Sequence, residues 1–500
     1  MKHSIVYQFD IREFFFRHQQ TNHKIKTLID LPFEFFKELK ALGVDYIWPL
    51  GIYEPSKESQ KIAREMKELH RRYDESLPGW TIEDVIGSPY AIKSYSVSKS
   101  FGADRFYTKF KELLLKKFDL KIILDFVHNH VAIDNPIVKK HPEYFIHCVE
   151  NNELKYSPDF YELKAGEKTY FIAHGRDPYF PSWKDTLQLD YRSKSVQKFM
   201  INELLKLSKK CDGVRCDMAM LGLSNIFHNN WKNYQLPNDA VPSGKEFWRE
   251  AIDKVKKKNP DFIFIGEVYW DCEKDLLDLG FDYVYDKKFY DLMVKQNILL
   301  INEYIKRAFT YGRNRFLFLE NHDEPRSSLV FNLDYIKVLA TLVYTLPSMK
   351  LIHAGQIEGK KYPHAIQLRR IYSEPLNGEL KNFYLKLLFA IKSSTITNGY
   401  FKYLNPLPAW EGSISHNNFT IFLYENEKMN IDLVVLNLSP YQSQCKVKVE
   451  SYNIVDKKFL IKDRLSDEEY LRDGNEMYYD GLYFDLKPYQ SQIFQFIKTE

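Results

Sequence analysis

The stretch GVRCDMAM, residues 213–220, is an apolar run that carries an arginine and an aspartate two positions apart. Side chains alternate between the two faces of a strand, so Arg215 and Asp217 share one face while Val214 and Cys216 share the other. Burying two charges is costly unless they are paired and used. The run therefore predicts a buried strand that ends in a functional charged pair.

Similar apolar runs alternate with amphipathic helical patterns over the first 400 residues. Strand–helix repetition of this kind predicts a parallel sheet with helices outside, and runs that are apolar on both faces fit strands buried on both sides. About eight units can be counted, which favours a closed (β/α)₈ TIM barrel over an open doubly wound sheet. The clearest helical patterns are 31–42 and 104–118, and the clearest strand patterns are 5–9, 44–50, 120–127, 213–217, 262–268, 315–321 and 349–355.

Two regions depart from this rhythm. Residues 131–190 follow the third strand without a clear long helix, and an excursion of that length in a compact barrel is normally functional. From about residue 400 the pattern changes to alternating strands, which predicts a small antiparallel β-sandwich. We therefore predict a barrel formed by 1–130 and 191–400, an inserted domain at 131–190 and a C-terminal β-domain at 401–500.

The composition excludes several classes of function. The chain has 500 residues with a net charge of only +4, which gives no argument for a nucleic-acid or membrane partner. Its five cysteines form no CxxC pair, so neither a disulfide framework nor a zinc site is indicated. No stretch approaches the roughly 20 apolar residues that span a bilayer. A cytoplasmic enzyme is expected, and its oligomeric state stays open.

Polar clusters follow four of the predicted strands. A single acid after a strand is often a helix N-cap, but four clusters at one end of consecutive strand–helix units favour a shared function. The clusters contain several carboxylates, and the sequence has neither metal-ligand spacing nor a phosphate-binding loop. Cleavage of a glycosidic bond is a reaction that uses such carboxylates. The clusters are Asp125, His128, Asn129 and His130; Arg215 and Asp217; Glu267; and Asn321, His322, Asp323 and Arg326.

Each carboxylate has an expected role. Arg215 should hold Asp217 ionised, because an adjacent cation lowers the pKa of an acid, so Asp217 is the candidate nucleophile. Glu267 has no basic neighbour in its own strand, and burial should raise its pKa as a general acid requires. Asp323 should grip sugar hydroxyls, and His130 and His322 should donate hydrogen bonds to the same ring.

These residues carry a resemblance to the α-amylase superfamily of retaining glycoside hydrolases. DFVHNH, GVRCD, IGEVYW and FLENHDEPR resemble the four short regions of that family, in the same order. The resemblance implies the (β/α)₈ fold, an α-glucan or maltooligosaccharide substrate, Asp217 as nucleophile, Glu267 as acid/base and Asp323 as transition-state stabiliser. It further implies that the sugar is bound by Tyr90, His130, Arg215 and His322, with Asp125 as a supporting acid.

Several positions depart from the family pattern. Many members follow the nucleophile with AxKH, whereas residues 218–221 read MAML here, which weakens the case for calcium and for starch-type acceptor specificity. No cofactor is expected for the chemistry, and Asn129 is the one candidate calcium ligand. Asp190 stands where asparagine is commoner. A metal site at HNH, with His128 and His130 two residues apart, lacks a third ligand at compatible spacing.

Three functions remain open at this stage. The first is hydrolysis of α-glucosidic bonds by double displacement. The second keeps the same glycosyl-enzyme but passes the sugar to another sugar, as maltosyltransferases do. The stretch GSPYAI, residues 87–92, resembles maltosyltransferase-type members of the family. The third is a non-catalytic binding protein on the same barrel, although such a relic would be expected to have lost one of the three acids.

Overall fold

Eight parallel strands close into a barrel, which confirms the predicted TIM-barrel fold. The computed structural model describes residues 3–149, 157–242, 244–311 and 314–499. Around the barrel, neighbouring strands are hydrogen-bonded in the order β1, β2, β3, β9, β10, β11, β12, β13. These are Ile5–Asp10, Tyr46–Leu50, Lys121–Phe126, Gly213–Cys216, Ile263–Gly266, Tyr283–Tyr285, Arg315–Leu317 and Met349–His353.

The register of the strands brings the polar clusters to one end of the barrel. Arg215 on β9 pairs with Asp125 on β3 and with Ile265 on β10. Asp217 and Glu267 each follow directly after their strands, so both emerge at the carboxyl-terminal rim. Strands β1, β2 and β13 are buried at every position, and most of their side chains are apolar.

Strand β11 is the barrel strand that the sequence patterns did not reveal. It spans only Tyr283–Tyr285, between two short helices, and its three residues are all buried. A run this short carries no periodicity of its own. Its place in the barrel is fixed by pairing with β10 and β12.

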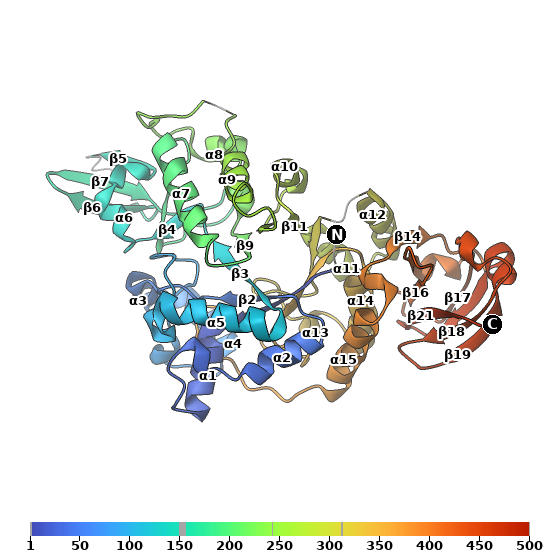
Figure 1. Cartoon of the computed structure of the whole chain (residues 1–500). Helices are drawn as coiled ribbons and strands as arrows, with labels where there is room; N and C mark the ends of the chain where they lie inside the picture. The colour runs from blue at the N-terminus through green and yellow to red at the C-terminus, as the bar shows by residue number, and fades with distance from the viewer. Residues whose placement is uncertain (1–2, 150–156, 243, 312–313, 500) are drawn as a thin grey trace.

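Helices surround the barrel, as Figure 1 shows. The patterns at 31–42 and 104–118 become α2 and α5, so both predictions are confirmed. The residues between β2 and β3 add two helices, α3 and α4, to which the sequence analysis assigned no structure. The principal helices are α1 Ile11–Thr21, α2 Phe33–Ala41, α3 Lys57–Glu65, α4 Lys67–Ser76, α5 Ala103–Phe118, α7 Lys194–Leu207, α8 Ser224–Trp231, α9 Phe247–Lys256, α10 Glu273–Asp278, α11 Lys287–Val294, α12 Ile298–Tyr311, α14 Leu333–Thr345 and α15 Gly378–Lys392.

The segment predicted as an inserted domain forms two small antiparallel sheets. One pairs β4 (His130–Ala132) with β8 (Thr186–Gln188), and the other has the order β5 (His147–Val149), β7 (Lys168–Ala173), β6 (Phe160–Ala165). Its one described α-helix, α6, spans only Pro136–Lys140. Residues 150–156 of this segment lie outside the described residues.

The C-terminal β-domain lies at the opposite end of the molecule from the inserted sheets (Figure 1). It contains a six-stranded antiparallel sheet and a two-stranded sheet with a separate apolar core. This confirms the predicted C-terminal β-domain. The larger sheet has the order β14 (Tyr400–Leu404), β15 (Phe419–Glu425), β16 (Ile431–Asn437), β21 (Ser491–Lys498), β18 (Lys458–Asp463), β19 (Glu469–Asp473), and the smaller pairs β17 (Ser443–Val447) with β20 (Leu482–Leu486).

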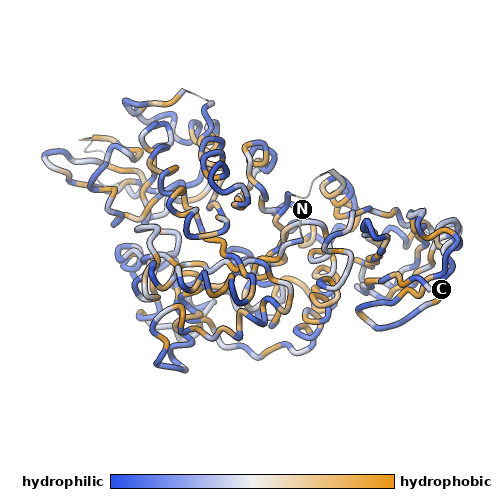
Figure 2. Tube along the Cα trace, viewed as in Figure 1, coloured by the Kyte–Doolittle hydropathy of each residue, from blue (hydrophilic) through white to orange (hydrophobic). Residues whose placement is uncertain are grey.

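Hydrophobic segments concentrate in the strands and long helices, while the outer loops are mostly hydrophilic (Figure 2). Within the described ranges, no helix combines the length and apolar character needed to cross a bilayer.

Candidate active site

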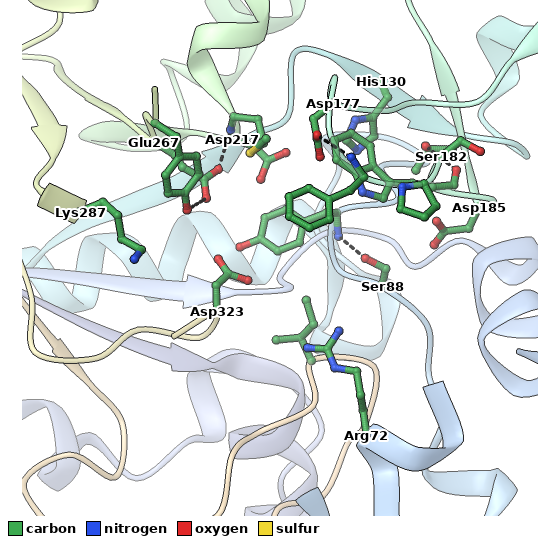
Figure 3. Close-up of a pocket in the computed structure, with 18 of the residues that line it drawn as sticks. Arg72, Ser88, His130, Asp177, Ser182, Asp185, Asp217, Glu267, Lys287 and Asp323 are labelled. Carbon is green, nitrogen blue, oxygen red and sulfur yellow. Dashed lines mark hydrogen bonds between the residues drawn. The ribbon is translucent and has the colours of Figure 1, made fainter. Parts of the chain in front are cut away.

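The three candidate carboxylates lie around one cleft at the carboxyl-terminal end of the barrel. Asp217, Glu267 and Asp323 all line this cleft, whose volume is about 1200 Å³. Figure 3 shows Asp217 and Glu267 on one side of the space and Asp323 on the other, with all three side chains directed into it. Three barrel strands therefore deliver three acids to one cavity that is large enough for several sugar rings.

Arg215 joins two of these acids. Its Nη1 lies 2.6 Å from Oδ1 of Asp217, and its Nη2 lies 2.8 Å from Oε2 of Glu267. The guanidinium is 1% exposed and stacks on aromatic rings, with centroid distances of 5.4 Å to Trp48, 5.3 Å to Tyr90 and 5.6 Å to Tyr285. A planar cation of this kind fixes the positions of both carboxylates.

Glu267 is buried, and burial raises its pKa to about 7 against the opposing effect of Arg215. The sequence analysis expected this rise because Glu267 has no basic neighbour in its own strand; the structure adds a basic neighbour from the adjacent strand, since Arg215 reaches across from β9. Oε2 accepts hydrogen bonds from the Met218 backbone N–H at 2.6 Å and from Arg215, whereas Oε1 accepts one from the Tyr269 hydroxyl at 3.1 Å. Two donors on Oε2 leave Oε1 as the oxygen that carries the proton.

Asp323 stays ionised because of its histidine neighbour. Partial burial acts to raise its pKa, but the His322 ring, with Nε2 3.0 Å from Oδ2, lowers the pKa to about 2. Burial acts to lower the pKa of His322, and Asp323 outweighs it and raises that pKa. On the far side of the ring, the Gln8 side-chain nitrogen lies 2.6 Å from Nδ1 of His322.

Tyr90 and His130 line the cleft, as the sequence analysis expected of sugar-binding residues. The Tyr90 ring stacks on His322 with centroids 5.6 Å apart, and its hydroxyl lies 2.5 Å from Nε2 of that ring. Burial lowers the pKa of His130, which keeps its imidazole neutral near pH 7. Both rings therefore present fixed surfaces to the cavity.

Asp125 and Arg215 lie beneath the cleft and are not among its lining residues. Asp125 accepts a hydrogen bond from the Trp48 indole at 2.8 Å and lies 3.5 Å from Arg215. Burial raises the pKa of Asp125 to about 6. This placement suits a supporting acid and an orienting cation rather than direct contact with a sugar.

Several residues of this network were missed by the sequence analysis. Gln8 on β1, Trp48 on β2 and Tyr285 on β11 each contact a candidate residue. A polar residue inside the apolar run IVYQF is the signal that would have found Gln8.

The two histidines of HNH have different surroundings. His128 is fully buried, with ring centroids 4.6 Å from Trp248 and 5.5 Å from Tyr191, and burial lowers its pKa to about 3. His130 instead packs against Trp183 and faces the cleft. Among the described residues, no group of three His, Cys, Asp or Glu side chains could hold a metal ion.

Asn129 does not fit a calcium site. Its Oδ1 accepts a hydrogen bond from the Gln188 amide at 3.0 Å, and its Nδ2 donates to Oε1 of Gln188 at 3.1 Å. Both side chains are buried, so this reciprocal pair uses the oxygen that an ion would need. Nearby, Asp190 forms an ion pair with Arg192 at 2.8 Å, which accounts for an acid at that position.

Comparison with known proteins identifies the family. Residues 34–382 match the model of the family described as "Alpha amylase, catalytic domain". The chain belongs to the α-amylase family. This confirms the resemblance that the four short sequence regions indicated.

Curated relatives are distant and longer. An α-amylase, MalA, from Haloarcula japonica is 23% identical over 72% of this chain and 44% of its own length. A cyclomaltodextrinase from Thermoanaerobacter pseudethanolicus is 23% identical over 59% of this chain and 49% of its own length. The chain thus spans about half the length of the curated relatives it matches.

Solved structures of this family share the fold over the whole chain. A maltogenic α-amylase from Thermotoga neapolitana superposes with a TM-score of 0.68 at 19% identity and covers 99% of both chains. An α-amylase from Geobacillus thermoleovorans gives a TM-score of 0.67 at 17% identity, covering 100% of this chain and 99% of its own. At these identities the similarity shows the fold alone.

Proposed function

We propose that this family member is a retaining glycoside hydrolase that cleaves α-glucosidic bonds in α-glucans or maltooligosaccharides. The observation that carries the proposal is the bridge from Arg215 to Asp217 and Glu267, which sets an oriented carboxylate and a neutral acid on one cleft. Such a division between two carboxyl groups is what glycosidic cleavage requires.

In the first step, Asp217 attacks the anomeric carbon of the bound sugar. Arg215 holds one Asp217 oxygen, which leaves the other free to form the ester. Glu267 donates the proton on Oε1 to the leaving glycosidic oxygen, so the departing sugar leaves as a neutral alcohol. The negative charge of Asp323 stabilises the oxocarbenium-like transition state.

In the second step, Glu267 acts as a base. As a carboxylate it takes a proton from water, the water oxygen bonds to the anomeric carbon and the bond to Asp217 breaks. Two inversions give net retention of configuration. The nucleophile, the acid/base and the stabilising anion are all side chains of this protein.

The sugar at the point of cleavage is bound by the surfaces around the three acids. Tyr90 offers its ring for stacking, and His130 offers its imidazole for a hydroxyl group. His322 is not among the residues that line the cleft, and its ring nitrogens are engaged by Gln8, Asp323 and Tyr90, so it acts by fixing Asp323 and Tyr90. Gln8 and Asp125 act through their neighbours, by orienting His322 and Arg215 respectively.

A product time course on maltoheptaose tests the proposal. Proton NMR should show shorter maltooligosaccharides whose new reducing ends form first as the α-anomer. Release of the β-anomer would exclude the double displacement, and the absence of any cleavage of α-glucans would exclude the function.

Transfer of the glycosyl group to a second sugar is the other candidate function. It uses the same intermediate, and the aromatic side chains of Tyr269 and Trp270, which line the cleft next to Glu267, favour it.

A further inference from the structure

The active-site cleft adjoins a second cavity beside Asp323. This cavity, of about 260 Å³, lies between helix α4 and the loops that follow strands β12 and β13, and we call it the side cavity. Asp323 and Arg72 line both spaces, and Figure 3 shows the Arg72 side chain rising from α4 into the space beside Asp323. Because Asp323 acts on the sugar that becomes bound to Asp217, the side cavity adjoins the part of the cleft that holds this sugar, the donor side.

Four of the side chains that line the side cavity are almost fully buried. Ser76, Asn321, Arg326 and His353 are 4%, 2%, 4% and 5% exposed. Each nevertheless keeps a polar atom to which no described residue hydrogen-bonds. Buried polar atoms in folded proteins are nearly always hydrogen-bonded, either to the protein or to a bound molecule. The side cavity therefore has the character of a binding site and not of a packing defect.

The contacts of these side chains show which atoms stay free. Asn321 Oδ1 accepts two backbone N–H groups of its own loop, each at 2.8 Å, which leaves Nδ2. Arg326 uses Nε and Nη1 on backbone carbonyls and on Glu320, which leaves Nη2. The same carboxylate lies 3.2 Å from Nδ1 of His353, which leaves Nε2. The Ser76 hydroxyl has no partner within the described part of the chain.

The charges around the side cavity favour a neutral ligand. Three carboxylates line it, those of Glu75, Asp323 and Glu324, against the two guanidinium groups of Arg72 and Arg326. The second of these cations is already paired with a buried carboxylate. An anion would meet an excess of negative charge, and a metal cation would meet N–H groups. Hydroxyl groups suit the site, because each can donate to a carboxylate and accept from an N–H group.

The side cavity has the size of a single sugar. Its volume equals the space of about nine water molecules at liquid density, which is enough for one hexose ring but not for a chain. The cleft, at about 1200 Å³, has the room for the main chain of an α-glucan. A chain joined through O4 can send a second arm into an adjoining cavity only from another hydroxyl group, and in branched α-glucans that group is O6.

We propose that the side cavity binds a glucosyl residue attached through an α-1,6 bond on the donor side, so that the protein prefers branched over linear α-glucans. This deepens the proposed function and rests on it. Ser76, Asn321 and Arg326 hydrogen-bond the hydroxyl groups of the branch sugar, and Arg72 lies at the junction with the main chain. The α-1,6 bond itself stays intact, since the nucleophile and the acid both line the cleft.

Two trisaccharide donors test the proposal on the full-length protein. α-Panosyl fluoride and α-maltotriosyl fluoride differ only in the bond to the outer glucose, which is α-1,6 in the first and α-1,4 in the second. Fluoride is a small leaving group that needs no sugar on the acid side, so its release reports donor binding and ester formation. The panosyl donor should have the higher kcat/KM by about tenfold, the gain expected from one or two hydrogen bonds.

Two variants and one control probe the side cavity itself. Leu329 lines the cavity and is 64% exposed, so Leu329→Trp should obstruct it without disturbing the core. This variant should remove the preference and leave the rate on the maltotriosyl donor close to that of the wild type. Ser76→Ala removes one hydroxyl group and should lower the preference roughly threefold. Ser96→Ala, at an exposed serine outside the cavity, should change neither rate.

The outcomes separate the branch site from the proposed function. Equal kcat/KM values for the two donors in the wild type, or a preference that both variants retain, would overturn the branch site and leave hydrolysis standing. A wild type that releases fluoride from neither donor and leaves maltoheptaose intact would overturn the proposed function itself.

Discussion

Nη2 of Arg215 lies 2.8 Å from Oε2 of Glu267, across the gap between strands β9 and β10. The same guanidinium also contacts Asp217, so one buried cation holds both carboxylates of the proposed reaction. Despite that contact, burial keeps the pKa of Glu267 near 7. The relationship explains how an acid can be fixed in place by a cation and still keep a substantial protonated fraction near pH 7.

Removing either carboxylate should abolish turnover without unfolding the protein. Asp217→Asn and Glu267→Gln each preserve the shape of the side chain while removing the nucleophile or the acid, so kcat on maltoheptaose should fall by about 10⁴-fold. Circular dichroism should match the wild type. Asp334→Asn and Glu379→Gln change exposed carboxylates elsewhere on the surface and serve as matched controls. Near-normal rates in either active-site variant would refute the assigned roles.

The rate should fall on the alkaline side of pH 7. Glu267 must be protonated to donate to the leaving oxygen, and because its pKa is raised to about 7, the protonated fraction declines above that pH. kcat/KM should therefore decrease by about tenfold per pH unit once the pH exceeds the pKa. The residual activity of Glu267→Gln should lack this alkaline limb. A wild-type profile that stays flat to pH 9 would contradict the assignment of Glu267 as the acid.

The fold and the three acids could be predicted because their signals are local in the chain. Strands such as β3 and β10 carry apolar runs, IIL and IFI, and Asp217 and Glu267 follow directly after their own strands. Strand β11 could not be found, since three residues between two helices carry no periodicity. Its position depends on pairing with strands that are distant in sequence.

The charge environment of the site residues could not be predicted, because it depends on contacts between different barrel strands. Nothing in FIFIG, the run before Glu267, indicates that Arg215 of the preceding barrel strand reaches this acid. Likewise Gln8 meets His322 although 314 positions separate them in the chain. The residue types were predictable, while the partners of each residue required the closed barrel.

A second buried ion pair supports the loop that carries Asp323. Glu320 is fully buried and contacts Arg326 at 2.7 Å. Burial acts to raise its pKa, but Arg326 and His353 lower it to about 2. Because this folded-state pKa is depressed, the stabilisation is present above the ordinary pKa of a glutamate and is lost as the pH falls toward 2.

Glu320→Gln should therefore destabilise the protein at neutral pH. The variant leaves Arg326 as an uncompensated buried charge, so the free energy of unfolding should drop by about 3–5 kcal/mol. Thermal unfolding measures this as a lower Tm. The double variant Glu320→Gln with Arg326→Met removes both charges and should recover part of the loss. Equal Tm values for the single variant and the wild type would show that the pair contributes nothing to stability.

Chelation should leave the stability of the protein unchanged, because Asn129 is bonded to Gln188 and not free for calcium. Thermal unfolding should give the same Tm with a chelator as with added calcium. Asn129→Ala should lower that Tm whether or not calcium is present, since it leaves the buried Gln188 amide without its partner, at a cost of about 1–3 kcal/mol. Asn417→Ala, at an exposed position, controls for the loss of an asparagine. A rise of several degrees with calcium in the wild type that disappears in Asn129→Ala would instead show that the amide pair opens and Asn129 binds the ion.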